Sequence, residues 1–279
     1  MVQATLFGPP EGDPERKPVG DAPVHMRVLV TVKAAPNPSE RYGETVCVAG
    51  VRAELPSKGL VRLYPINFRD LPSDETFRKY QIIELDAVPA RADQRRESWK
   101  PILSSIVQHE TLPPWWRRRQ WLDDYIEDSM CRINADARDH FDAKSLALVQ
   151  PKEVSDLHVE RHPGWSADDQ RKIDRYVNQL DLLDPREKKP LEAPRFLARY
   201  KYRCHDRNCN GHSQGLLHWE FVALQRNLAG RSDEEVKSHL RAKFLDSMCN
   251  SRRATAFFVG NQAKRVRVFS VLGVYYPER

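Results

Sequence analysis

A short run of cysteine and histidine in the last third constrains the fold of this chain most. Residues 204–212 read Cys-His-Asp-Arg-Asn-Cys-Asn-Gly-His, which gives the spacing C-x4-C-x2-H. Two thiolates and an imidazole at this spacing can reach one tetrahedral ion if the chain turns tightly, and Asn208, Asn210 and Gly211 favour such a turn. Because the run has almost no apolar side chains, a bound ion would order it in place of a hydrophobic core.

The motif therefore predicts a structural Zn2+ site. The predicted ligands are Cys204, Cys209, His212 and, as the fourth, His218. His205 and Cys249 are the alternatives for the fourth position. Without a metal, the two cysteines of the motif would form a disulfide or remain free thiols. A reducing compartment disfavours the disulfide. The other two cysteines, Cys47 and Cys131, lie in apolar segments and are expected in the core.

The net charge of the C-terminal third of the chain is opposite in sign to that of the rest. Residues 195–279 hold 16 Lys and Arg against 7 Asp and Glu, a net charge of +9, whereas residues 1–194 carry −3. A localised basic surface attracts nucleic acid, because neutralising phosphates releases their condensed counterions. A solvated basic face that serves only solubility is the alternative.

The candidate phosphate contacts are basic residues in three places. They lie beside the metal motif, beside the last strands, and in the segment Trp115-Trp-Arg-Arg-Arg-Gln-Trp121. They are Arg203, Arg207, Arg252, Arg253, Lys264, Arg265, Arg267, Arg117 and Arg118. Guanidinium groups pair with phosphates, and tryptophan rings stack on unpaired bases. A helix with its tryptophans turned inward explains the segment 115–121 equally well.

The hydrophobic pattern predicts an α+β fold. Short segments rich in valine and isoleucine predict strands at 27–33, 44–50, 60–64 and 81–88, which suits a small barrel or sandwich. One helix is expected to follow Pro113-Pro114 over residues 115–132, and others to begin at the capping residues Ser166 and Ser232. Further strands are expected at 145–149, 196–202, 255–260 and 266–275.

These elements predict four parts. They are a flexible tail over 1–26, a strand-rich module with a helical segment over 27–183, a charged proline-rich linker over 184–194, and a basic zinc-containing α+β module over 195–279. The linker prediction rests on three prolines in eleven residues, at the point where the charge balance changes sign.

Together these features favour a nucleic-acid-binding protein with a structural zinc. A metal-dependent nuclease is the first alternative, with Glu220, Asp86 or Asp93 as catalytic groups. A subunit that docks on a protein partner through its tail and tryptophan helix is the second. No apolar run approaches the roughly 20 residues that span a bilayer, and the first residues do not resemble a secretory signal, so we expect a cytoplasmic protein without a membrane partner.

Overall fold

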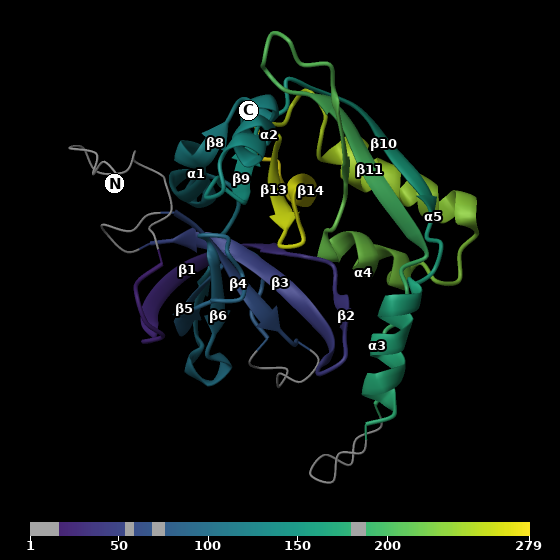
Figure 1. Ribbon diagram of the computed structural model, residues 1–279. Helices are drawn as coiled ribbons and strands as arrows, with labels where there is room; N and C mark the ends of the chain where they lie inside the picture. The colour runs from purple at the N-terminus through teal and green to yellow at the C-terminus, as the bar shows by residue number, and fades with distance from the viewer. Residues whose placement is uncertain (1–16, 54–58, 69–75, 180–187) are drawn as a thin grey trace, which may run out of the picture.

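The structure, a computed structural model, describes residues 17–53, 59–68, 76–179 and 188–279 (Figure 1). Most of the predicted tail and the first part of the predicted linker lie outside these residues. Within them the chain is mixed α+β, as predicted. Among the described residues, no helix has the length and apolarity needed to cross a bilayer.

Five strands of the N-terminal part close into a barrel-like sheet. They are β1 (Val24–Lys33), β3 (Gly43–Arg52), β4 (Gly59–Ile66), β6 (Ser98–Pro101) and β5 (Gln81–Pro89). Each pairs with the next in this order, and β5 pairs back with β1, so the ring is closed. The short strands β2 (Asn37–Ser39) and β7 (Val107–Thr111) add to β3 and β5. The four predicted strands of this region are confirmed, since alternate residues such as Met26, Val28 and Val30 fill one core.

The rest of the chain builds two smaller sheets. A three-stranded sheet orders β10 (Glu153–Arg161), β11 (Phe196–Arg203) and β12 (His212–Gly215). A four-stranded sheet orders β14 (Arg265–Tyr275), β13 (Ala256–Gln262), β9 (Leu146–Val149) and β8 (Ile126–Glu127). Figure 1 shows the barrel below and these two sheets above it.

The helices follow local signals, with one exception. In α3 (Ala167–Val177) and α5 (Asp233–Arg241), the Ser166 and Ser232 hydroxyls accept the predicted capping bonds. The single helix expected over 115–132 is wrong. The structure has α1 (Trp116–Leu122), a 3-10 turn at Asp123–Tyr125, and a separate α2 (Met130–Asp139). The chain extends into β8 between them, and Ser129 accepts the backbone N–H of Arg132 to start α2.

Three elements complete the C-terminal part. After β12 come α4 (Trp219–Asn227), α5, and the π-helical turn Ala242–Ser247. Because β13 pairs with β9, segments from both sides of residues 184–194 share one sheet. The division of the chain at that linker stays a prediction.

The barrel and the C-terminal sheet bury apolar faces against each other. Their shared core includes Val32, Ala49 and Val51 of the barrel strands and Leu146, Leu148, Phe258 and Leu272 of the four-stranded sheet. A buried polar network lies at the same boundary: Arg62 of β4 donates to the Ser145 hydroxyl at 2.8 Å, and this hydroxyl donates to Glu97 at 2.6 Å. The two parts are therefore fixed to each other by both apolar and polar contacts.

Candidate functional site

The predicted metal motif forms a tight turn between two strands. Cys204 directly follows β11, and His212 is the first residue of β12. Between them Asp206 organises the turn: its carbonyl accepts the N–H of Cys209 at 3.1 Å and its carboxylate accepts the N–H of Asn208 at 2.9 Å. Gly211 completes it with a φ of +102°, a conformation that suits glycine.

A third cysteine joins the motif from a distant part of the sequence. Cys131 is the second residue of α2, and its Sγ lies 3.7 Å from Sγ of Cys204 and 3.6 Å from Nε2 of His212. His212 Nε2 lies 3.3 Å from Sγ of Cys209 and 3.5 Å from Sγ of Cys204. The four ligand atoms all lie within 4.8 Å of one another.

These separations match one tetrahedral ion. Bonds of about 2.3 Å to sulfur and about 2.0 Å to nitrogen, at tetrahedral angles, place two sulfurs about 3.8 Å apart and a sulfur and a nitrogen about 3.5 Å apart. The sulfurs of Cys131 and Cys204 are too far apart for a disulfide, and all five cysteines are free. An iron–sulfur cluster, in which the ligands bind different iron atoms, needs wider spacing. The four side chains could therefore hold a single metal ion.

The electrostatics of the thiols also favour a bound cation. Burial acts to raise the pKa of Cys204, but hydrogen bonds from His212 and nearby backbone groups outweigh it and lower the pKa to about 6. Burial and the sulfurs of Cys204 and Cys209 raise the pKa of Cys131 to about 12. A first thiolate thus forms readily, and a second one beside it needs a compensating positive charge.

The surroundings close the centre and orient its histidine. Cys204 and Cys209 are buried, and the Tyr202 ring lies 5.1 Å from the His212 ring, centroid to centroid. The Tyr202 hydroxyl in turn donates to Gln214 at 2.8 Å. A four-ligand site with little solvent access is typical of structural rather than catalytic zinc.

The structure places His218, the predicted fourth ligand, elsewhere. Its imidazole is 2 % exposed and lies between the barrel and α4, where its Nε2 is 3.4 Å from Nζ of Lys79. Cys131, expected as an ordinary core residue, takes the fourth corner instead. The reason is topological: residues after β12 run away from the motif toward α4, whereas the start of α2 lies against the turn, with the His205 N–H donating to the Asp128 carbonyl at 2.9 Å.

The arginines of the tryptophan segment are engaged within the protein. Arg117 pairs with Glu110 at 2.8 Å. Arg118 donates to the Leu112 carbonyl at 2.8 Å and lies 3.8 Å from the centre of the Tyr80 ring. Trp116 is exposed.

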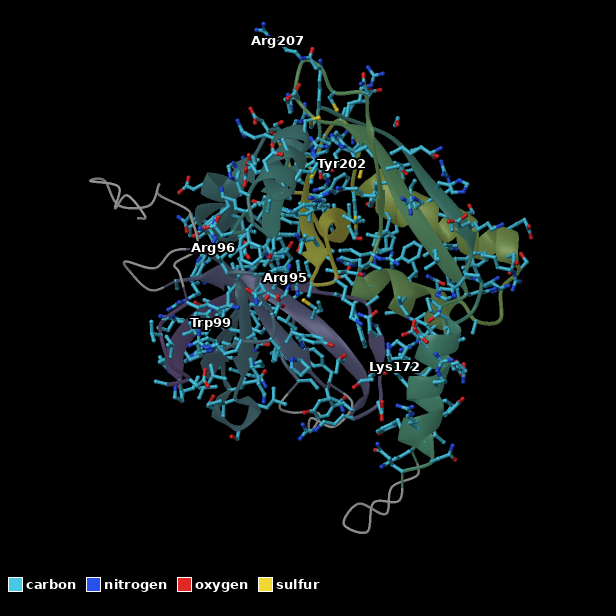
Figure 2. The ribbon with its side chains drawn as sticks, in the orientation of Figure 1. Arg95, Arg96, Trp99, Lys172, Tyr202 and Arg207 are labelled. Atoms are coloured by element: carbon cyan, nitrogen blue, oxygen red, sulfur yellow. The ribbon has the colours of Figure 1, made fainter. Side chains whose placement is uncertain are left out.

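The other predicted phosphate contacts fall into separate groups. Arg203 and Arg207 are exposed beside the metal turn, and Figure 2 shows Arg207 at the outer end of the molecule. Arg252 is exposed in a turn before β13, whereas Arg253 pairs with Glu278 at 3.1 Å. Arg203 and Arg207 are therefore the two of these residues that adjoin the metal turn in the chain.

The third group lies on the β13–β14 hairpin, which carries Lys264, Arg265 and Arg267. This hairpin meets the barrel, since Arg95 donates to the Asn261 side chain at 3.4 Å. In Figure 2 Arg95 lies in the middle of the molecule, far from Arg207. The hairpin is therefore a basic element distinct from the metal turn.

The candidate catalytic carboxylates lie apart. Asp86 accepts from His25 at 3.0 Å on the barrel surface, and Asp93 pairs with Arg95 at 2.6 Å. Glu220 lines a cavity between the barrel and α4. In the part of the chain that the structure describes, these three do not meet in one metal-binding group.

The sequence did not predict the roles of Cys131 and of Lys79, which contacts His218. Their common signal is weak: each is one residue in an ordinary strand, turn or helix start, and only the tertiary fold brings it to its partners. The position of Cys131 two residues after the capping residue Ser129 is the one local hint, because it fixes the side chain at the exposed end of a helix.

Comparisons with known proteins give family membership and little more. No curated protein matches the chain. Among solved structures it is similar to the crystal structure of the tetrameric p202 HIN2, at 8% identity and a TM-score of 0.30, over 95% of this chain and 98% of that one. Residues 24–124 match a family described as a domain of unknown function, DUF8758. Residues 126–279, more than half of the chain, match a second family profile, and the chain therefore belongs to the family described as a domain of unknown function, DUF8757.

Proposed function

We propose that this protein binds nucleic acid through the β13–β14 hairpin and that its Cys3His centre holds a structural zinc. One observation carries the first part. Lys264, Arg265 and Arg267 are exposed on the hairpin and form no ion pair within the described residues. Val266 and Val268, on either side of Arg267, are 46% and 55% exposed, so the hairpin presents apolar as well as cationic side chains.

Other basic groups of the C-terminal module are partly neutralised. On β11, Arg199, Lys201 and Arg203 share the exposed face, but they pair in register with a strand that carries acids. Glu153 faces Arg203 and Asp156 faces Lys201, while Glu160 lies opposite Leu197 on the same strand pair. Such a face repels phosphates about as much as it attracts them, which leaves the hairpin as the stronger candidate.

The barrel supports the same function by analogy. Its strand order, β1-β3-β4-β6-β5 and back to β1, resembles that of the OB-fold, a five-stranded barrel whose faces and loops often bind oligonucleotides. Here the C-terminal sheet covers the outer face of β3. The loop between β5 and β6, which carries Arg95 and Arg96, remains beside the hairpin. Because one fold serves many functions, this analogy only adds to the argument from the hairpin.

The zinc would act by stiffening the C-terminal module. It would tie the first turn of α2 to the turn between β11 and β12. Met130, Ile133 and Ala137 of α2 pack in one core with Phe269 and Val271 of β14. The metal centre thus supports the helix against which the hairpin strand packs.

Salt dependence tests the proposal. Fluorescence anisotropy with labelled single-stranded and duplex oligonucleotides, from about 50 to about 200 mM salt, should show affinity that falls steeply with salt. The variant Lys264→Ala/Arg265→Ala/Arg267→Ala should bind more weakly and lower the slope of log K against log salt by about 2 to 3. The control Arg199→Ala/Lys201→Ala/Arg203→Ala removes the same charge from β11, whose basic side chains lie beside the acidic residues of β10. This variant should bind nearly as well as the wild type.

Two results would contradict the proposal. One is the absence of binding to any DNA or RNA at low salt, which would favour docking on a protein partner. The other is an equal loss of affinity in both triple variants, which would show that only net charge matters.

Adding divalent cations to the same labelled strands tests the nuclease alternative, and we expect binding without cleavage. We also propose a cytoplasmic location, because a reducing compartment would keep the five cysteines free.

A further inference from the structure

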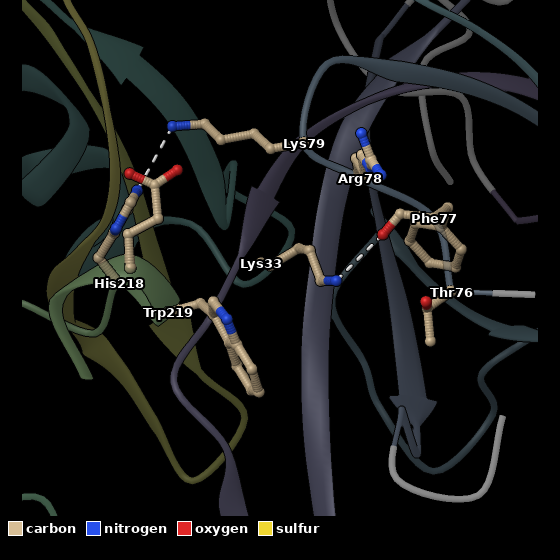
Figure 3. Close-up of a pocket in the computed structure, with 8 residues that line it drawn as sticks. Lys33, Thr76, Phe77, Arg78, Lys79, His218 and Trp219 are labelled. Atoms are coloured by element: carbon tan, nitrogen blue, oxygen red, sulfur yellow. Dashed lines mark hydrogen bonds between the residues drawn. The ribbon is translucent and has the colours of Figure 1, made fainter. Parts of the chain in front are cut away.

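A cavity lies between the barrel and the start of α4. It has a volume of about 270 Å³. Figure 3 shows Lys33 and Lys79 on the barrel side, with the Lys33 ammonium turned to the Phe77 carbonyl and the Lys79 ammonium turned to His218. Trp219 lines the cavity from the other side. A cavity at the boundary of two modules, lined by a few converging polar groups, is a common place for a small ligand.

The charges around this cavity do not balance. Lys33, Arg78 and Lys79 line it, and Glu220 is the one carboxylate among its lining residues. The excess is two positive charges. A phosphate monoester carries about −1.5 to −2 at neutral pH and would compensate this excess.

The tautomer of His218 follows from its contact with Lys79. The Lys79 ammonium can only donate, so at 3.4 Å from it the Nε2 atom of His218 is the acceptor. The neutral ring then carries its proton on Nδ1. This Nδ1 is buried and has no hydrogen-bond partner among the described residues. No surface of this atom is open to the cavity, so a ligand there would be held by the other groups that line it.

The helix that begins at the cavity adds further donors. His218 is the N-cap residue of the nine-residue α4, and its side chain makes no capping bond to the helix. Backbone N–H groups of a first helical turn that lack a cap attract anions, together with the helix dipole. On the opposite wall, the Phe77 ring lines the same cavity as Trp219. An aromatic or apolar body attached to the anion would find a surface there.

We propose that this cavity binds a small phosphate monoester. Lys33 and Lys79 would supply the compensating charge, and the first amides of α4 would donate to its oxygens. The site is separate from the hairpin and from the metal centre, so it does not depend on the proposed nucleic-acid binding.

Calorimetric titration of the full chain tests this site with inorganic phosphate and phenyl phosphate. Phenyl phosphate should bind at one site per chain, at least as tightly as inorganic phosphate. Lys33→Met and Lys79→Met should each weaken binding about tenfold or more, since each removes a charged hydrogen-bond donor. Glu220→Gln removes the opposing carboxylate and should tighten binding instead. The surface variant Lys100→Met should bind like the wild type.

The opposite directions for the lysine and glutamate variants separate an anion site from a general loss of structure. Thermal melts of each variant identify any that fail to fold, and Glu220→Gln, whose side chain is only half-buried, keeps the test informative if both lysine variants unfold. Absence of binding of both phosphates to the folded wild type would overturn the proposal. Weaker binding in Glu220→Gln would also do so, and binding of inorganic phosphate alone would overturn the assignment to a monoester.

Discussion

The sulfur atoms of Cys131 and Cys204 lie 3.7 Å apart although 73 residues separate them in the chain. A metal shared by both would close this long loop and tie the start of α2 to the turn between β11 and β12. Because the closure cost of a loop rises with its length, such a link stabilises the folded module against a flexible unfolded chain.

The identity of the fourth ligand gives the sharpest test of the metal centre. We expect purified wild-type protein to hold about one zinc per chain, and Cys131→Ser to lose most of it, because three ligands with an open corner bind zinc more weakly. His218→Asn, which changes the ligand that the local sequence suggests, should keep its zinc. Elemental analysis by mass spectrometry on protein prepared under reducing conditions measures both. Retention of zinc in Cys131→Ser with loss in His218→Asn would refute the geometry described here.

The sequence predicted those features that depend on neighbours along the chain. The alternation of valines in β1 and β3 predicted strands, and Ser166 and Ser232 predicted helix starts, because each signal acts within a few residues. Cys204, Cys209 and His212 were found in the same way, from spacing within one turn.

The features that were missed depend on tertiary approach. Cys131 reaches the metal centre only because α2 packs beside the β11–β12 turn, and Lys79 reaches His218 only because α4 starts at the barrel wall. The local sequence does not mark Lys79, and it gives Cys131 only its place in the first turn of a capped helix. The error at residues 123–129 has a related cause: the apolar spacing continued, but pairing of β8 with β9 overrode the helical preference.

The buried network between the two parts of the molecule predicts a large stability effect. Arg62 is 2% exposed and donates to Ser145, which also binds Glu97. Arg62→Met should lower the free energy of unfolding by about 3 kcal/mol, because it leaves the Glu97 carboxylate buried with less compensation. Chemical denaturation measures it. The exposed control Arg138→Met should change it by less than about 0.5 kcal/mol. Similar values for the two variants would show that the network is not a strong link.

The phosphate site should depend on pH through Lys33. Burial among the Phe68, Phe77 and Trp219 rings lowers the pKa of Lys33 to about 8. Below this pH the side chain is a cation and attracts the anion; above it the side chain is neutral. Affinity for phenyl phosphate should therefore fall as pH rises from about 7 to about 9, a range over which the ligand itself is already a dianion.

Titrations at several pH values measure this dependence. The other charged groups at the cavity are Arg78, Lys79 and Glu220. Burial also lowers the pKa of Lys79. Lys33→Arg keeps the positive charge at position 33 throughout the range, so its affinity should fall less from pH 7 to 9 than that of the wild type. If this variant shows the same loss as the wild type, the titrating group is not Lys33.

Metal removal should loosen one part of the molecule and leave the other intact. The centre joins α2 to the turn at residues 204–212, while the barrel has its own core built from Met26, Val28, Val48 and Leu63. After chelation at neutral pH, hydrogen exchange should speed up in α2 and in residues 204–212, and stay slow in β3 and β4. Mass spectrometry of peptic fragments resolves these segments. Adding back one equivalent of zinc should restore the slow exchange, because the ligands come from preformed elements. Equal acceleration in β3 and β4 would mean that the metal holds the whole chain together, and unchanged exchange in α2 would mean that the ion does not support that helix.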